Sequence, residues 1–254
     1  MKPRTFNSGK AIFVLLFFFS LIIFIASCTK SSSSPTPTSG SAFVSVTNAS
    51  PTLTAYAVYS DATNIYTAGT LGYGSTTGVV GGNPYATVAA GIHSIKLVSG
   101  GNNIVIDSNA TFTAGGHYSF FVYDTGQVKT LALTDNLTAP ASGMAKIRFL
   151  NFAPNSQSLN VWVVNTDTTT KDSTSFSNIG YIGSTVINVD SLSAFKTIPA
   201  GTHMVLFNSN AELNLFQNKS VTFASGKIYT LYAKGYVNGL NATDSLGLGV
   251  IQNY

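Results

Sequence analysis

The stretch Ala42-Phe43-Val44-Ser45-Val46-Thr47-Asn48-Ala49-Ser50-Pro51 recurs 103 residues later as Ala145-Lys146-Ile147-Arg148-Phe149-Leu150-Asn151-Phe152-Ala153-Pro154. In both copies the side chains alternate with a period of two, which is typical of a β-strand with one buried face. In the second copy Lys146 and Arg148 occupy the alternate positions, so we expect that face to meet solvent. The face predicted to be buried carries Val44, Val46, Asn48, Ile147, Phe149 and Asn151.

Four further segments repeat in the same order. The spacing between the copies increases from 103 residues through 108, 110 and 111 to 115, so the added residues fall between the matches, where loops tolerate insertion. Chance similarity would not preserve this order, and the chain therefore contains a tandem duplication. The matched segments are Leu71-Gly72-Tyr73 with Ile179-Gly180-Tyr181, Thr87-Val88-Ala89-Ala90-Gly91-Ile92-His93 with Thr197-Ile198-Pro199-Ala200-Gly201-Thr202-His203, Phe112-Thr113-Ala114-Gly115-Gly116-His117-Tyr118-Ser119 with Phe223-Ala224-Ser225-Gly226-Lys227-Ile228-Tyr229-Thr230, and Leu131-Ala132-Leu133 with Leu246-Gly247-Leu248.

Each copy is long enough to bury one hydrophobic core of its own. Short runs with a period of two, separated by turn residues, fill both copies, and neither copy has the pattern of a long helix. The sequence therefore predicts an all-β chain with two tandem antiparallel, immunoglobulin-like β-sandwich domains, at residues 42–138 and 145–254.

A shared spacing points to one structural hydrogen bond in each copy. Phe112-x-x-Gly115-x-x-Tyr118 recurs as Phe223-x-x-Gly226-x-x-Tyr229. This spacing resembles a tyrosine corner, in which a strand tyrosine donates or accepts a hydrogen bond at the backbone upstream. The alternative is an ordinary half-buried strand tyrosine. Tyr118 and Tyr229 are therefore structural candidates.

Residues 1–27 have the pattern of a bacterial lipoprotein signal peptide. Three basic residues precede an apolar run at residues 11–26, which is shorter than the ~20 residues of a membrane-spanning helix. The run ends in Ile25-Ala26-Ser27-Cys28, which resembles a lipobox, the motif whose cysteine receives a diacylglycerol. Cys28 is the only cysteine of the chain, so we predict lipidation at Cys28 and a mature chain without disulfides. An ordinary secretory signal and an uncleaved anchor are the alternatives.

Residues 28–41 are rich in Ser, Thr and Pro, and we interpret them as a flexible tether between the lipid and the first domain. The tether has no acidic residue, which favours the periplasmic face of the outer membrane over the cell surface. Beyond residue 27, ten basic and nine acidic residues leave a net charge of +1. The basic residues are scattered, which argues against nucleic acid as a partner.

The Asn-x-[Ser/Ala]-Pro after the first strand, the later Ala-Gly-x-His and the Gly-x-x-Tyr-[Ser/Thr] strand together resemble a known family, the domain of unknown function 4397. This family occurs in exported bacterial proteins and lipoproteins, often in tandem. The resemblance covers residues 42–254, and the second copy departs from the first in longer loops at residues 165–177 and 183–193. The family has no established activity, so it implies no catalytic or cofactor-binding residue.

The sequence offers no clear catalytic site, metal site or cofactor. A Gly-x-Ser-x-Gly motif is absent, and His93 and His203 occupy equivalent positions, which favours a shared structural role. Asn48 and Asn151 precede the prolines and are expected to form Asx-type turns. Asp167 and Asp172 lie in one polar loop without the spacing of an EF-hand, which favours a solvated loop over a calcium site. Four Asp-Ser/Thr tripeptides, starting at Asp167, Asp172, Asp190 and Asp244, resemble a periplasmic O-glycosylation sequon.

The leading hypothesis is a non-enzymatic cell-envelope lipoprotein, held on the membrane by its lipid, that acts as a binding or structural accessory module for an envelope protein. The second hypothesis is glycan binding, with Trp162, the only tryptophan, as a candidate ligand contact. The third is a hydrolase whose site is assembled in space, which a cluster of His with Asp or Glu in an open cleft would favour.

Overall fold

The computed structural model describes residues 40–78, 82–100, 103–166, 173–184, 188–209, 217–241 and 244–254. The chain divides into two compact units, Met1–Thr36 and Pro37–Tyr254, and every described residue belongs to the second unit. The predicted signal peptide, Cys28 and the tether before residue 40 lie outside the described residues. Within those residues, no helix is long and apolar enough to cross a membrane.

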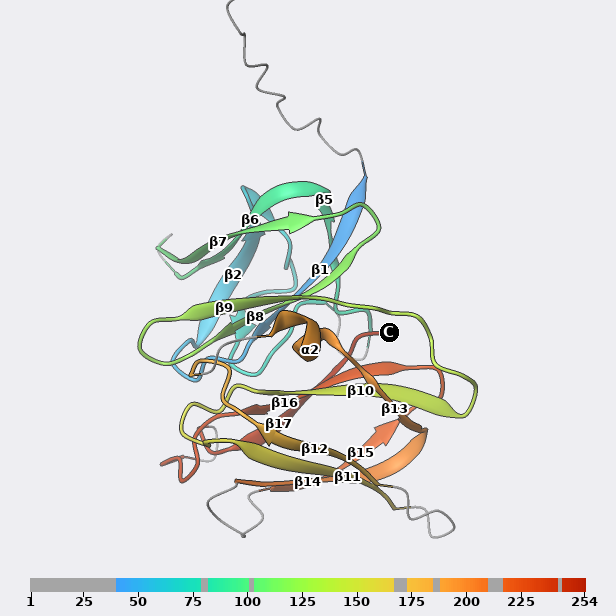
Figure 1. Ribbon diagram of the computed structural model, residues 1–254. Helices are drawn as coiled ribbons and strands as arrows, with labels where there is room; N and C mark the ends of the chain where they lie inside the picture. Colours follow the sequence, from blue (N-terminus) through green and yellow to red (C-terminus); the bar gives the residue numbers. More distant parts are fainter. Residues whose placement is uncertain are drawn as a thin grey trace, which may run out of the picture. The chain divides into compact units, whose positions relative to one another are not determined.

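The first repeat is a sandwich of two β-sheets (Figure 1). Its strands are β1 (Ser41–Asn48), β2 (Ala55–Ser60), β3 (Thr63–Asn64), β4 (Leu71–Gly72), β5 (Ala86–Ala89), β6 (Gly91–Val98), β7 (Ile104–Phe112), β8 (His117–Tyr123) and β9 (Lys129–Thr134). One sheet has the order β5-β1-β8-β9, and the other has the order β3-β2-β6-β7, with β4 also paired to β2.

The second repeat repeats this arrangement and adds one short helix. Its elements are β10 (Met144–Asn151), β11 (Leu159–Asn165), β12 (Ser173–Ile179), α2 (Val189–Ser193), β13 (Lys196–Pro199), β14 (Gly201–Ser209), β15 (Gln217–Phe223), β16 (Ile228–Lys234) and β17 (Gly247–Gln252). The sheets have the orders β13-β10-β16-β17 and β12-β11-β14-β15. In each repeat the first strand runs parallel to a late one, β1 with β8 and β10 with β16, and all other pairs of named strands are antiparallel.

The all-β sandwich class predicted from the sequence is confirmed, and each sandwich closes over a core of its own. The residues predicted to face inward do so: Val44 and Val46 belong to the first core, and Ile147 and Phe149 belong to the second. Strands of both sheets contribute to each core, as the alternation of apolar side chains along them requires.

The outer faces of the β1 sheet and the β10 sheet are also buried, because the two repeats pack against each other there. A third apolar cluster fills this interface, and in it the rings of Phe121 and Phe152 lie 4.9 Å apart between centroids. The prediction that Arg148 meets solvent is therefore wrong: Arg148 is only 1 % exposed. Lys146, at the end of the same face, is half-buried, and its Nζ donates to the carbonyl oxygen of Thr138 at 2.7 Å.

The pairing of the strands agrees with the predicted alignment of the two repeats at four of the five matched segments. It corrects the alignment of the last segment. Phe121 pairs with Leu131, and the equivalent Tyr232 pairs with Gly249, so the final spacing is 118 residues and not 115. The sequence match failed because it paired Leu133 with Leu248, and Leu248 faces the core of its own sandwich whereas Leu133 faces the interface. A shift of an odd number of residues moves a strand side chain to the opposite face.

Candidate functional site

Equivalent residues of the two repeats meet across the interface in both directions. Tyr123 of the first repeat packs against Tyr181 of the second, with ring centroids 6.5 Å apart. At the equivalent contact, Lys234 of the second repeat lies over the ring of Tyr73 of the first, with Nζ 4.3 Å from the ring centroid. Such reciprocal contacts are the mark of an isologous interface. The repeats are therefore related by an approximate two-fold axis.

A buried polar cluster occupies this interface. Arg148 Nη1 lies 2.7 Å from Asp135 Oδ1, and both side chains are almost fully buried. Ser119 and Tyr85 donate hydrogen bonds to Asp135 Oδ2, each at 2.6 Å. The Arg148 guanidinium also donates to Thr230 and Ser119 and lies over the ring of Phe195. The charges thus satisfy each other inside the protein.

Burial and the carboxylate of Asp135 both change the pKa of Tyr85. Desolvation, followed by the charge of Asp135, raises the pKa of Tyr85 far above its usual range, so the phenol stays protonated and keeps donating to Asp135. Asn253, equivalent to Asp135 by register, donates to the Tyr85 hydroxyl at 3.0 Å. The cluster is therefore a network of mutually bonded side chains, and two of its members, Tyr85 and Asn253, also line a cavity of about 450 Å³.

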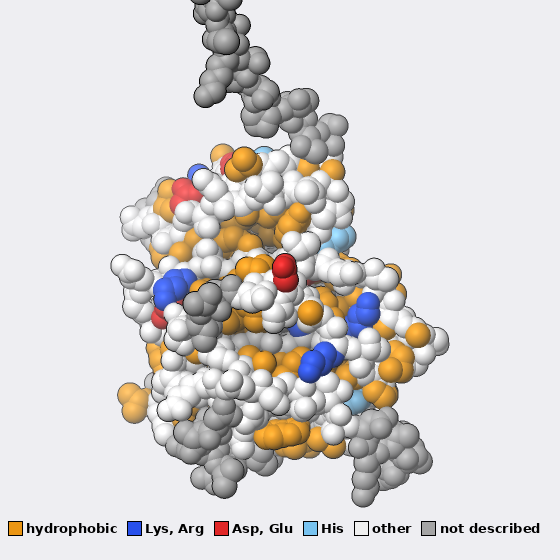
Figure 2. Space-filling model, viewed as in Figure 1, with side chains coloured by type: hydrophobic (Ala, Val, Ile, Leu, Met, Phe, Trp, Pro, Cys, Tyr) orange, Lys and Arg blue, Asp and Glu red, His pale blue; other side chains and the backbone are white. Residues whose placement is uncertain are grey.

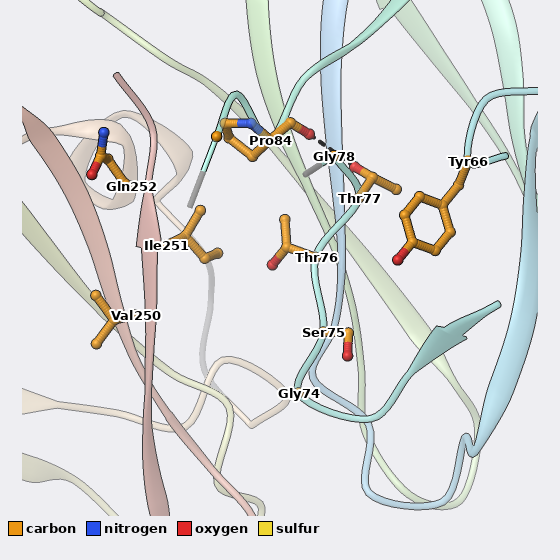
Figure 3. Close-up of a pocket in the computed structure, with 11 residues that line it drawn as sticks. Tyr66, Gly74, Ser75, Thr76, Thr77, Gly78, Pro84, Val250, Ile251 and Gln252 are labelled. Atoms are coloured by element: carbon orange, nitrogen blue, oxygen red, sulfur yellow. Dashed lines mark hydrogen bonds between the residues drawn. The ribbon is translucent and has the colours of Figure 1, made fainter. Parts of the chain in front are cut away.

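A groove lies at the rim of the interface, between β17 and the segment 74–78 (Figure 3). Its volume is about 360 Å³. On one side β17 contributes Ile251, whose side chain points toward Thr76, whereas the side chains of Val250 and Gln252 point away from that segment. The described residues that line the groove are uncharged: Tyr66, Gly74, Ser75, Thr76, Thr77, Gly78, Gly82, Pro84, Val250, Ile251 and Gln252.

The wall formed by residues 74–78 is held firmly against β1. Gly74 N and Thr77 N donate to the carbonyl oxygens of Asn48 and Val46 at 2.7 and 2.8 Å. Gly74 has a φ of +74°, which a residue with a side chain rarely adopts, and its carbonyl oxygen accepts a hydrogen bond from Tyr232 Oη at 3.2 Å. The groove thus has two fixed walls, one from each repeat.

On the opposite side of the two-fold axis lies α2, and the repeat offsets of 108 and 110 make residues 79–85 its counterpart in the first repeat, with 79–81 outside the described residues. The helix lies next to β9, the strand equivalent to β17 (Figure 1). Its Leu192 packs against the interface cluster, and Lys129 Nζ donates to the carbonyl oxygen of Gly183 at 3.3 Å. The loop that the sequence placed at residues 183–193 therefore lies on this side of the interface, and the offsets of 108 before it and 110 after it make it two residues longer than its counterpart in the first repeat.

The two candidate tyrosines make the contacts that a tyrosine corner requires. Tyr118 Oη accepts a hydrogen bond from Thr113 N at 2.9 Å, and Tyr229 Oη accepts one from Ala224 N at 2.9 Å. Each ring also packs edge-on against the phenylalanine of its motif, Phe112 or Phe223, with centroids 5.1 Å apart. Both tyrosines stabilise a turn, and neither of them lines the groove.

Trp162 lies on the outer sheet of the second repeat, half-buried and on the face opposite to the core. It pairs with Leu206, and in the first repeat Tyr59 pairs with Lys96 at the equivalent position. Each outer sheet therefore carries one aromatic side chain near its centre. The sequence alignment had not matched these two aromatics, because the strands around them differ.

The histidines are engaged in structural contacts. His93 Nδ1 lies 2.6 Å from Asp61 Oδ2, and its Nε2 lies 3.4 Å from the carbonyl oxygen of Ala90. The hydrogen bond to Asp61 raises the pKa of His93 and engages its Nδ1 in a structural contact. His203 is buried and contacts the carbonyl oxygen of Gly201 at 3.1 Å. Each ring lies next to the equivalent phenylalanine, His93 stacked near Phe112 and His203 tilted against Phe223.

The remaining candidates of the sequence are structural or lie outside the described residues. Asn48 Oδ1 accepts from Ser50 N at 3.1 Å and Asn151 Oδ1 accepts from Ala153 N at 3.0 Å, so both form the predicted Asx turns. The acidic loop at residues 167–172 is outside the described part. Within the described part, no group of three or more His, Cys, Asp or Glu could hold a metal ion. Charged side chains are scattered singly over the face in Figure 2.

Sequence reasoning missed Arg148, Asp135 and the interface. The signal was present in the run Ser119-Phe120-Phe121-Val122-Tyr123, which is apolar on both faces and predicts a strand buried on both sides. The groove had no such signal, because main chain and small side chains form most of it.

Residues 42–162 match the family model described as "Domain of unknown function (DUF4397)". This segment of the chain belongs to that family. The match extends over the first repeat, β10 and the first part of β11, so it includes both β1 and its equivalent β10. No curated protein matches the chain.

Two solved structures show only a remote likeness to the chain. A leucine-rich repeat protein from Bacteroides thetaiotaomicron is 13 % identical, with a TM-score of 0.21, over 79 % of this chain and 26 % of its own. The chain thus spans about a quarter of that protein. CBMbc (family CBM26) from Eubacterium rectale Amy13K, in complex with maltoheptaose, is 14 % identical, with a TM-score of 0.24, over 81 % of this chain and 100 % of its own. Scores this low support no conclusion about function.

Proposed function

We propose that this protein is a non-enzymatic accessory lipoprotein of the cell envelope, which binds a protein partner while its lipidated Cys28 holds it on the membrane. The observation that carries the proposal is the joining of two sandwiches through a buried interface. The ion pair of Arg148 and Asp135 and the hydrogen bonds from Arg148 to Ser119 and from Asn253 to Tyr85 fix the two repeats to each other. A body built in this way presents sheet edges and loops at fixed positions, as a binding scaffold needs.

The membrane part of the proposal is tested by lipidation. The wild-type chain should incorporate radiolabelled palmitate in cells and sediment with membranes, and Cys28→Ala should do neither. Labelled or membrane-bound Cys28→Ala protein would refute lipidation at this residue.

The binding part is tested by photo-cross-linking in cells that express the full-length lipidated protein. A photoreactive residue is placed in turn at exposed positions on the groove rim, such as Ser75, and on the outer sheets. Cross-links to one defined envelope protein, confined to one face of the molecule, are expected. A substrate turned over by the purified protein, with loss of turnover in a point variant, would instead establish an enzyme.

Glycan binding is the second candidate, and the aromatic pair Tyr59 and Trp162 favours it. Aromatic rings on open sheet faces can stack against sugar rings, and Trp162 and Leu206 are half-buried on one such face. Trp162→Ala decides the matter, with binding measured on a glycan array. Loss of sugar binding with an unchanged unfolding midpoint supports the candidate, and unfolding of the variant makes Trp162 a packing residue.

A further inference from the structure

The tripeptide Asp-Ser-Leu occurs twice in the chain, as Asp190-Ser191-Leu192 in α2 and as Asp244-Ser245-Leu246 before β17. Both copies resemble the O-glycosylation sequon, and the proposed function gives neither of them a role. Because the two copies are identical, the sequence alone cannot rank their serines as acceptors. The structure ranks them, since a serine receives a sugar in a folded protein only where its hydroxyl group is accessible at the surface.

The hydroxyl group of Ser191 lies on the open side of α2. The residues Asp190 and Ser191 are exposed, and neither side chain has a hydrogen-bond partner among the described residues. The turn is closed by other groups: Ser191 N donates to Asn188 Oδ1 at 3.1 Å, and Leu192 N donates to the carbonyl oxygen of Asn188 at 3.1 Å. Leu192 also packs against the interface cluster. The helix is therefore fixed to the protein by Leu192, and the hydroxyl of Ser191 remains accessible.

Ser245 has the same sequence neighbours and a closed environment. Its Oγ donates to the carbonyl oxygen of Asn241 at 2.8 Å and lies 3.4 Å from that of Gly239. The backbone of Gly239 is so close that a Cβ atom there would lie 2.8 Å from Ser245 Cα. The neighbouring Asp244 Oδ2 accepts from Asn241 Nδ2 at 3.2 Å. A sugar on Ser245 would have to break hydrogen bonds and displace this loop, whereas a sugar on Ser191 would break none.

We propose that Ser191 is an O-glycosylation site of the exported protein and that Ser245 is not. The donor is an oligosaccharide carried on a polyprenyl pyrophosphate in the membrane, and a transferase recognises the carboxylate of Asp190 beside the acceptor. Ser191 Oγ forms a bond to the anomeric carbon of the sugar, and the bond from that carbon to the pyrophosphate oxygen breaks. The hydroxyl proton passes to a basic group of the transferase, and the polyprenyl pyrophosphate leaves. The proposal rests on the export that the proposed function requires, and it does not depend on the partner.

A glycan on Ser191 would cover the surface beside β9. The helix α2 lies next to β9, which is the last strand of its sheet (Figure 1). An open sheet edge can pair with strands of other chains, and a bulky, hydrated sugar beside it hinders such pairing. The partner of the proposed function would therefore contact another face of the molecule.

The test is mass spectrometry of the full-length protein, purified from the membranes of the bacterium that carries its gene. Cleavage after lysine places the two serines on different peptides, residues 172–196 and 235–254. Fragmentation by electron transfer leaves sugars attached and assigns them to single residues. It therefore also distinguishes Ser191 from Ser173, which follows Asp172 in the first peptide.

Two variants remove the proposed signal without removing a hydrogen bond of α2. Ser191→Ala removes the acceptor, and the turn keeps its bond because only the N–H of Ser191 takes part in it. Asp190→Asn removes the charge and keeps the size of the side chain. Both variants should lose the glycan at residue 191. The same changes in the other copy, Ser245→Ala and Asp244→Asn, are the matched controls and should leave the glycan on Ser191 unchanged.

Three results would overturn the proposal. The first is a Ser191 without sugar in membrane-bound protein that has been cleaved before Cys28. The second is a glycan that persists in Asp190→Asn, which would show that the carboxylate is not recognised. The third is equal glycosylation of Ser191 and Ser245, which would show that exposure in the folded protein does not select the acceptor. Each result is obtained on exported, lipidated protein, so none of them contradicts the proposed function, which its own lipidation and cross-linking experiments decide.

Discussion

At the residue scale, the repeats are held by a few buried hydrogen bonds that recur in both copies and by one charge pair that does not. Tyr118 and Tyr229 are equivalent and make the same bond, whereas Arg148 stands where the first repeat has Ser45. The first kind of contact stabilises one sandwich. The second kind joins the two.

Removing one of the repeated bonds should cost about 1 kcal/mol of unfolding free energy. Tyr118→Phe leaves the amide of Thr113 without its hydroxyl acceptor, and Tyr229→Phe does the same to Ala224. The measurement is the urea midpoint at an unchanged slope, with the exposed Tyr254→Phe as the control. An unchanged midpoint for both variants would show that these bonds add nothing to stability.

Breaking the charge pair should cost more, about 3–5 kcal/mol, because Arg148→Met leaves the carboxylate of Asp135 buried without compensation. Adding Asp135→Asn should recover much of this loss, since the amide oxygen still accepts from Tyr85 and Ser119 and no charge remains. Equilibrium denaturation of the single and double variants measures the recovery. A double variant that is less stable than Arg148→Met would contradict this account.

The pair His93 and Asp61 should give a small pH dependence of stability. The hydrogen bond to Asp61 raises the pKa of His93, so its contribution is complete below pH about 6.5 and is lost as the pH rises through the raised value. The hydrogen bonds from Ser94 N and then His93 lower the pKa of Asp61, so its contribution is present above pH about 3.9 and is lost as the pH falls through the lowered value.

The contribution is therefore largest between these two limits, and it should stay below about 1 kcal/mol because both side chains are partly exposed. Urea midpoints at about pH 5.5 and 8.5 should differ less in His93→Gln than in wild type. Equal differences in the two proteins would exclude His93 as the source.

At the element scale, one difference between the repeats lies in the strands that meet at the interface. Leu131 of β9 corresponds to Gly249 of β17, where a Cβ atom would lie only 2.0 Å from the ring of Tyr232. The ring of Tyr232 takes the space that a side chain of β17 would need. The glycine is required by this close approach.

Gly249→Ala should therefore destabilise the protein by about 1–3 kcal/mol, the usual cost of overpacking a core. Gly247→Ala on the same strand is the matched control, because its Cβ would meet only Ser245 O, at 3.7 Å. Thermal unfolding of the two variants provides the comparison. Equal losses would mean that the cost comes from the strand backbone and not from Tyr232.

The sequence predicted what is encoded in local alternation and in repetition. The sandwich class, the inward faces of β1 and β10 and the Asx turns at Asn48 and Asn151 all depend on neighbours within a few residues, and they are confirmed. The buried position of Arg148 was not predictable from its own strand, because a second repeat covers a face that looks polar. The groove was not predictable either, because main chain and small side chains form most of its lining.

At the scale of the whole molecule, the shared interface should make the two repeats unfold together. Trp162 is the only tryptophan and lies in the second repeat, so its fluorescence reports on that repeat alone, whereas far-UV circular dichroism reports on the strands of both. If the repeats were independent, the two probes would give separate transitions. Because the third cluster and the Arg148–Asp135 pair are lost when either repeat unfolds, we expect coincident urea transitions in wild type.

In Arg148→Met the interface is weakened more than either sandwich core, so the two transitions should move apart. Coincident transitions in this variant as well would mean that the apolar contacts of the interface alone couple the repeats, and that the ion pair serves to select the pairing of one repeat with the other.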